Sequence, residues 1–159
     1  MLLKPYRVLD LTQTRGMLCA QILGDLGADV IQVEPVGGSE GRNIGPFVGS
    51  AAKGENSLSW WGYARGKRSI ELDLVAQREE FLALVKRADF LIESEPVGSL
   101  DSQGFGYEQL HELNPMLIQV SITPYGLSGP KSSWAASDLT LMASAGPLSM
   151  TGDEESPPV

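Results

Sequence analysis

The first 34 residues alternate between short apolar runs and a stretch with helical spacing, and this alternation constrains the fold more than any other feature. Residues 6–11 read as a buried strand, Met17 to Leu26 carries apolar residues at helical spacing, and residues 28–34 form a second apolar run after Gly27. The pattern therefore predicts a β-strand, an α-helix and a second β-strand.

The same alternation continues along the rest of the chain. Further strands are predicted at 69–74, 88–93 and 116–122, helices at 77–87 and 107–113, and a long glycine-rich loop at 35–57. Strands separated by helices favour an α/β fold, a largely parallel sheet with helices on its faces. Such sheets bind ligands beyond the carboxyl ends of their strands, which directs attention to the loops at 12–16, 35–46 and 94–104.

Composition narrows the classes of function. The 159 residues fit one domain, and their net charge of −8 disfavours nucleic acid, which is bound through Lys and Arg. No apolar run approaches the roughly 18 residues of a membrane span, so no membrane role is expected. The N-terminus shows no export signal, and we expect a cytoplasmic protein. The single cysteine, Cys19, is expected to be a buried helix residue.

A rigid turn follows the last predicted strand. Thr123-Pro124, Gly126 and Gly129-Pro130 stop the strand, and Ser137 or Asp138 is placed to cap the helix that begins there. A helix N-terminus carries about half a positive charge and can stabilise a carboxylate or a bound anion. An ordinary helix cap is the alternative interpretation of this segment.

Several familiar sites are disfavoured. Glycines 16, 24 and 27 lack the spacing of the dinucleotide fingerprint, and a zinc site or a Ser-His-Asp triad would depend on the single histidine, His111. We therefore expect no metal. A carboxylate is already ionised at neutral pH and needs no partner base to act as a nucleophile, so covalent catalysis through Asp or Glu is compatible with this sequence.

Seven segments, in one order, resemble the N-terminal part of the class III coenzyme A transferases, the formyl-CoA and carnitine CoA transferase family of the CaiB/BaiF type. They are Val8–Leu11, Leu26–Pro35, Lys67–Leu74, Ala88–Glu93, Gly104–Glu108, Leu113–Pro115 and the Tyr125–Pro130 turn. The resemblance implies that residues 1–159 are the N-terminal segment of a Rossmann-like large domain, with helices on both faces of a mostly parallel sheet. It also implies an interlocked homodimer.

The activity implied by the resemblance is transfer of CoA from an acyl-CoA thioester to a free carboxylic acid through an aspartyl-CoA thioester. A closed pocket is expected, because water would hydrolyse the intermediates. By the resemblance, the nucleophilic aspartate lies beyond Val159, so this chain alone is expected to be inactive. Asp138 matches an acidic position lining the family's site, and we expect it to support the reaction by hydrogen bonding or charge rather than to attack.

The resemblance also implies residues that approach CoA. Arg15 and Arg42 match positions near the coenzyme, Leu74 matches one near the adenine, and the fork of Arg42 suits phosphate oxygens. The matching groove positions that depart from the family are Ser94, Glu95 and Ser102, where an aromatic residue and positive charge are missing. The segment Arg65–Arg68 could restore positive charge, or it could be a solvated turn.

Two other functions remain open from the sequence. The altered groove and the absent nucleophile segment fit a non-catalytic acyl-CoA or protein-binding remnant. A 2-methylacyl-CoA racemase is the other alternative, but related racemases carry a histidine where this chain has Ser137. Serine cannot serve as their acid or base at neutral pH, and the sequence favours the transferase.

Overall fold

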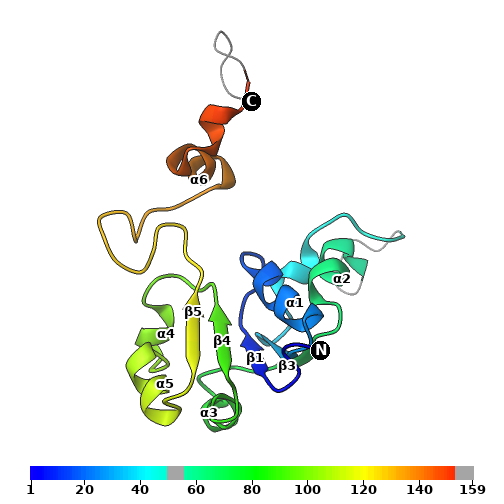
Figure 1. The fold of residues 1–159 in the computed structure, drawn as a ribbon, viewed down its shortest axis with the longest axis vertical. Helices are drawn as coiled ribbons and strands as arrows, with labels where there is room; N and C mark the ends of the chain where they lie inside the picture. Colours follow the sequence, from blue (N-terminus) through cyan, green and yellow to red (C-terminus); the bar gives the residue numbers. More distant parts are fainter. Residues whose placement is uncertain (50–55, 153–159) are drawn as a thin grey trace. The chain divides into compact units, whose positions relative to one another are not determined.

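The computed structural model describes residues 1–49 and 56–152, and the chain divides into two units, Met1–Ile122 and Thr123–Val159. Each unit is described by itself below. Figure 1 shows the first unit as an α/β structure and the second as a helix that follows an extended connection. No helix in the described residues has the length and apolar character needed to cross a membrane.

The first unit contains a five-stranded sheet within its described residues. Its strands lie in the order β3-β2-β1-β4-β5 and all neighbouring pairs are parallel. Their bounds are β1 Arg7–Asp10, β2 Asp29–Glu34, β3 Arg68–Glu71, β4 Phe90–Glu93 and β5 Ile118–Ser121. The predicted parallel sheet is confirmed, and each strand lies inside a segment predicted from its apolar pattern or begins one residue before it.

Helices connect the strands, as the parallel arrangement requires. Within the described residues of the first unit they are α1 Met17–Asp25, the 3₁₀ helix η1 Glu40–Asn43, α2 Leu58–Ala64, α3 Arg78–Val85, α4 Ser99–Ser102 and α5 Tyr107–Leu113. The three helices predicted from periodicity, α1, α3 and α5, are confirmed. The segments η1, α2 and α4 were not predicted: η1 and α4 have four residues, too few to show a helical period, and of the seven residues of α2 only Trp60 is buried.

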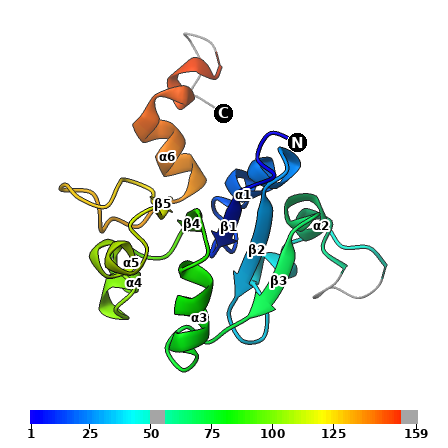
Figure 2. The same cartoon turned by 60° about the horizontal axis from the view of Figure 1, so that its bottom comes forward.

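Successive residues of each strand face opposite sides of the sheet and build two apolar layers. Val8, Val30 and Ile92 pack with Ala20 of α1 on one face. On the other face, the cluster joins strand residues to α3, α4 and α5 and consists of Leu9, Ile31, Leu91, Phe81, Val85, Leu100, Leu110 and their neighbours. Helices therefore cover both faces, as Figures 1 and 2 let the reader follow. Cys19 lies on α1 as predicted, but it is only partly buried against the first layer and not fully buried.

The second unit contains α6, Asp138–Ala145, and a 3₁₀ helix, η3, Pro147–Met150. The predicted cap at Ser137 is confirmed: its side chain accepts a hydrogen bond from the Thr140 N–H, and the Thr140 hydroxyl accepts one from the Ser137 N–H. This reciprocal pair satisfies two backbone donors that a helix start otherwise leaves open. Ser137 thus has a structural role that fixes where α6 begins.

Candidate functional site

A pocket of about 300 Å³ lies at the carboxyl ends of the parallel strands. Each of the three loops predicted to matter contributes to it. Its lining residues are Leu11, Gln13, Val33, Glu34, Pro35, Val36, Leu72, Asp73, Leu74, Glu95, Leu100 and Gln103. Residues that follow β1 and β4 lie on its walls, and between these two strands the chain order of the sheet reverses. Open α/β sheets bind ligands beside such a reversal.

The polar groups that line this pocket are carboxylates and amides. Asp73 and Glu95 supply the carboxylates, Gln13 and Gln103 supply the amides, and the carboxylate of the lining residue Glu34 is itself 1% exposed and bonded to Arg42. No Lys or Arg stands among the described lining residues. The pocket wall itself therefore favours a neutral group that donates hydrogen bonds over a phosphate.

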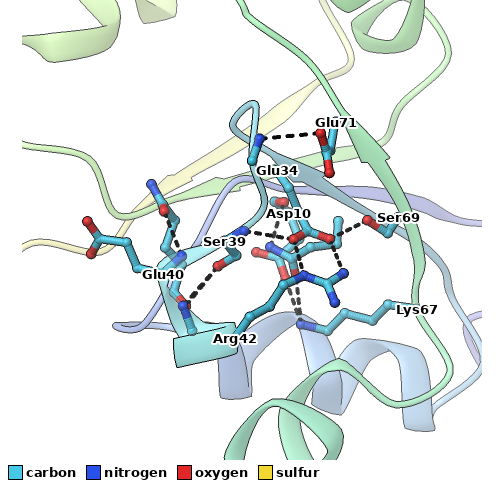
Figure 3. Close-up of polar contacts among 12 residues, drawn as sticks. Asp10, Glu34, Ser39, Glu40, Arg42, Lys67, Ser69 and Glu71 are labelled. Carbon is cyan, nitrogen blue, oxygen red and sulfur yellow. Dashed lines mark hydrogen bonds and ion pairs between the residues drawn. The ribbon is translucent and has the colours of Figure 1, made fainter. Parts of the chain in front are cut away.

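Glu34, the last residue of β2, forms an ion pair with Arg42 beside the pocket. The Arg42 Nε lies 2.7 Å from Glu34 Oε2, and a terminal guanidinium nitrogen lies 2.8 Å from Oε1. Figure 3 shows the two side chains meeting end to end, with Ser39 and Ser69 on either side. The Ser39 N–H donates to Oε2 at 2.8 Å, and the Ser69 hydroxyl donates to Oε1. The two-pronged geometry is the strong form of such a pair.

The environment of Glu34 shifts its pKa. Burial by itself raises the pKa of this carboxyl, but the hydrogen bonds from Arg42, Ser69 and Ser39, with the charge of Arg42, hold it below its ordinary value. The Arg42 guanidinium also lies over the buried Trp60 ring, 4.4 Å from its centre. Arg42 is therefore anchored on both sides, and the segment that carries it is fixed against β2.

A second charged pair is buried completely behind the pocket wall. The Lys67 ammonium lies 2.7 Å from Asp10 Oδ2, and the two side chains are 2% and 0% exposed. Figure 3 shows Lys67 reaching from the start of β3 toward Asp10, at the end of β1. The interpretation of Arg65–Arg68 as a solvated turn is therefore wrong for Lys67. It holds for Arg65, whose side chain is 58% exposed, whereas Arg68, 60% exposed, is solvated but is the first residue of β3 and not part of the turn.

The loop after β1 contacts the segment that carries Arg42. The Ser39 hydroxyl donates to the Gln13 carbonyl oxygen at 3.3 Å, and the Glu40 N–H donates to Gln13 Oε1 at 3.3 Å. Gly41 is buried against the same carbonyl, so closely that a Cβ atom at this position would collide with it. Glycine is therefore required for the approach of the two loops.

Replacing Gly41 with alanine should lower the free energy of unfolding by about 1–3 kcal/mol, because the added methyl group must push two backbone segments apart. The matched control is Gly62→Ala within α2, where a Cβ would meet no atom within 4 Å. Alanine there should stabilise by about 0.5–1 kcal/mol, since it favours the helix. Urea unfolding followed by circular dichroism measures both. Equal effects of the two substitutions would contradict the close approach at Gly41.

The structure places the predicted site residues in four groups. Leu74 and Glu95 line the pocket. Arg42 contacts its wall through Glu34, while Ser94 and Ser102 are chain neighbours of lining residues. Arg15 is exposed in the loop after β1, two residues beyond Gln13. Asp138, exposed at the first position of α6, belongs to the second unit.

Sequence reasoning missed the residues that hold the site together, Asp10, Gln32, Glu34 and Lys67. In the structure each of the first three is at most 1% exposed. The signal available in the sequence was that these polar residues stand inside otherwise apolar strands. His111 lies exposed on α5, stacked on Tyr107. Among residues 1–49 and 56–152, no group of three or more His, Cys, Asp or Glu side chains is arranged to hold a metal ion.

Comparison with known proteins identifies relatives along nearly the whole chain. The chain is 40% identical over 156 residues to the succinyl-CoA:(R)-benzylsuccinate CoA-transferase subunit BbsE of Thauera aromatica, covering 97% of this chain and 38% of that protein. It is also 40% identical over 159 residues to the succinyl-CoA:mesaconate CoA-transferase of Haloarcula hispanica, covering 96% of this chain and 40% of that protein. The chain thus spans about two-fifths of the length of these relatives.

Solved structures show the same relationship. A CAIB/BAIF family protein from Brucella suis superposes with a TM-score of 0.85 at 35% identity, over 97% of this chain and 42% of that one. Rv3272 from M. tuberculosis superposes with a TM-score of 0.83 at 34% identity, over 99% of this chain and 44% of that one. Residues 3–159 match the sequence model of CoA-transferase family III. With the α/β fold and the relatives in agreement, the chain belongs to CoA-transferase family III.

Proposed function

We propose that the complete protein is an acyl-CoA:carboxylate CoA transferase, and that this chain is the N-terminal part of its large domain. The observation that carries this proposal is family membership along residues 3–159, together with a pocket at the carboxyl ends of the parallel strands. Relatives that share about 40% of their residues with this chain are named as succinyl-CoA transferases. We propose acyl-CoA and a carboxylic acid as the two substrates.

In this proposal, the pocket receives the adenine end of CoA. Leu74 contributes an apolar surface for the base, and the carboxylate-rich lining suits a ring that donates hydrogen bonds from an amino group. The phosphates then lie outside the pocket, on the side of Arg42 and Arg15. Ser94, Glu95 and Ser102 form the remainder of the groove, with less positive charge than is usual in the family.

The chemistry that we propose is covalent transfer through an aspartate beyond Val159. Its carboxylate attacks the thioester carbonyl and releases CoA thiolate, which leaves a mixed anhydride. The thiolate then attacks the aspartyl carbonyl, expels the donor acid as a carboxylate and forms an aspartyl-CoA thioester. The acceptor carboxylate then attacks the aspartyl-CoA thioester, which releases CoA thiolate and gives a second mixed anhydride. The thiolate attacks the acyl carbonyl of the acceptor, which forms the new acyl-CoA and frees the aspartate carboxylate. Asp138 would tune this site by charge or hydrogen bonding, in a cytoplasmic homodimer.

Binding of CoA to this chain is the direct test, with Leu74→Trp as the variant that fills the pocket. We expect CoA to release or absorb heat on titration into the chain, and the tryptophan to weaken binding by at least about tenfold. Val75→Trp is the matched control, because Val75 is 63% exposed and does not line the pocket. Calorimetry measures all three proteins. The absence of heat at millimolar CoA, or an equal loss in the control, would contradict CoA binding in this pocket.

The transfer activity needs a separate assay. The chain and a protein extended beyond Val159 are each incubated with succinyl-CoA and a series of carboxylic acids, and new acyl-CoA is detected by mass spectrometry. We expect transfer by the extended protein and none by residues 1–159. Exchange of the α-proton with deuterated solvent, without transfer, would instead support the racemase alternative.

A further inference from the structure

We propose that the buried pair Lys67 and Asp10 is a positioning device that holds the loop of residues 12–16 in the shape that forms one wall of the pocket. Gln13 of this loop lines the pocket, and its neighbour Thr12 is completely buried. The expected effect of this pair on ligand affinity rests on the proposed function of the pocket. Its consequence for the loop itself stands independently of the ligand.

The ammonium group of Lys67 has an acceptor for each of its three hydrogens. It lies 2.7 Å from Asp10 Oδ2, 3.2 Å from Gln32 Oε1 and 3.3 Å from the carbonyl oxygen of Met17. These acceptors belong to β1, β2 and the first residue of α1. One side chain thus ties the two ends of the loop, β1 and α1, to the segment that enters β3.

The remaining atoms of the cluster hold the backbone of Thr12. Asp10 Oδ1 accepts the Thr12 N–H at 3.0 Å and the Thr12 hydroxyl at 2.6 Å. The Gln32 side-chain amide donates to the carbonyl oxygen of Asp10 at 3.1 Å and to that of Thr12 at 2.6 Å. The donor, the acceptor and the side chain of Thr12 are all engaged, so the loop leaves β1 in one direction.

The energetics of buried ion pairs favour a positioning role over a stabilising one. Removing two charges from water is costly, and well-packed apolar residues of similar size often give equal or greater stability. A cluster in which every donor and acceptor is satisfied instead selects one arrangement, because any other leaves a buried polar group unpaired. The buried pair therefore contributes by fixing the conformation of the loop and not by adding net stability.

The effect of that geometry reaches the pocket through Gln13. Its carbonyl oxygen and side chain accept hydrogen bonds from Ser39 and Glu40, next to Gly41 and the ion-paired Arg42. A loop that moved at Thr12 would carry Gln13 with it and open the contact with this second segment. Lys67 and Asp10 do not line the pocket, so they act through the loop and not on the ligand.

The test is the double variant Asp10→Asn with Lys67→Gln, which removes both charges but keeps groups able to hydrogen-bond. Hydrogen exchange of the chain without ligand is followed by mass spectrometry, and CoA affinity by calorimetry. We expect exchange in residues 12–16 to accelerate by at least about tenfold, while Leu91 and Ile92 in β4 exchange as in the wild type. CoA affinity should fall by a similar factor. Lys86→Gln, which neutralises an exposed lysine, is the control and should change neither.

A second variant covers the case in which the double variant does not fold. Thr12→Val keeps the shape of the side chain and the ion pair but removes the 2.6 Å hydrogen bond to Asp10, and it should accelerate exchange of the same loop. Unchanged loop exchange in a folded variant would overturn the proposal. So would acceleration of β4 by the same factor, or loss of folding in both variants, because either would make the pair a determinant of overall stability. If the wild-type chain binds no CoA, the proposed function fails, while loop exchange still decides the positioning role.

Discussion

Replacing Phe81 with alanine should lower the free energy of unfolding by about 3–5 kcal/mol. Phe81 is 0% exposed, and its ring meets that of Phe105 edge to face with their centres 5.0 Å apart. It lies on α3 in the larger of the two apolar layers, among residues of several strands and helices that cannot all move to fill the space it leaves. Urea unfolding monitored by circular dichroism gives the free energy directly.

The matched control for this substitution is Tyr107→Ala. Tyr107 is also aromatic and also on a helix, but it is 57% exposed and stacks only on His111 among the ring contacts described. Its replacement should change the free energy of unfolding by less than about 0.5 kcal/mol. A loss below about 1 kcal/mol for Phe81→Ala would show that this layer is not the core of the unit.

Replacing Glu34 with glutamine should cost about 3 kcal/mol at neutral pH. Glutamine keeps the size of the side chain, but it is neutral and its amide nitrogen replaces one of the two oxygens that now accept hydrogen bonds from Arg42, Ser39 and Ser69. The Arg42 side chain is 21% exposed and can partly reach water, which places the cost near the lower end of the range for a broken buried pair. Chemical unfolding at pH 7 measures the difference.

The same substitution should change how stability depends on pH. Because the pKa of Glu34 is lower in the folded than in the unfolded protein, its contribution is complete above the unfolded value of about 4.3 and is lost as the pH falls through the folded value. The wild-type and Glu34→Gln proteins should therefore approach equal stability at low pH. Asp29, whose pKa is also lowered because hydrogen bonds from Arg7 and Arg68 outweigh its burial, adds pH dependence of the same sign to both proteins.

Glu71→Gln is the control for Glu34. Glu71 ends β3 as Glu34 ends β2, but it is exposed and accepts one described hydrogen bond, from the Gly37 N–H at 3.3 Å. Its replacement should change stability by less than about 0.5 kcal/mol. If the curves for Glu34→Gln and the wild type stayed parallel down to acid pH, the ion pair with Arg42 would not contribute to folding.

The sequence predicted the sheet well because the first strands carry a local signal. Val8 and Leu9 face opposite layers, as do Val30 and Ile31, so an uninterrupted apolar run is what a strand buried on both faces requires. The helix α2 gave no comparable signal. It begins at Leu58, after the cap residue Ser57, whose side chain accepts a hydrogen bond from the Trp60 N–H, and of its seven residues only Trp60 is buried.

The site was predictable in outline but not in detail. Parallel strands bring their carboxyl ends to one side of the sheet, which is why the sequence alone predicts that the loops containing Gln13, Pro35 and Glu95 meet. The pairing of Asp10 with Lys67 joins residues 57 positions apart in the chain. No local pattern distinguishes that lysine from the exposed Arg65 and Arg68 beside it, since only the packing of α1, β1 and β3 buries it.

The two edges of the sheet in the first unit differ in their resistance to amyloid-like pairing. At one edge, β3 is only four residues long and carries Arg68 and Glu71 at its ends. Short, charged edge strands discourage a second chain from adding a strand, because the incoming backbone would bring these charges out of water. At the other edge, β5 reads Ile-Gln-Val-Ser and contains no charged side chain. Both edge strands are protected by being only four residues long, but charge adds protection against cross-β growth at the β3 edge alone.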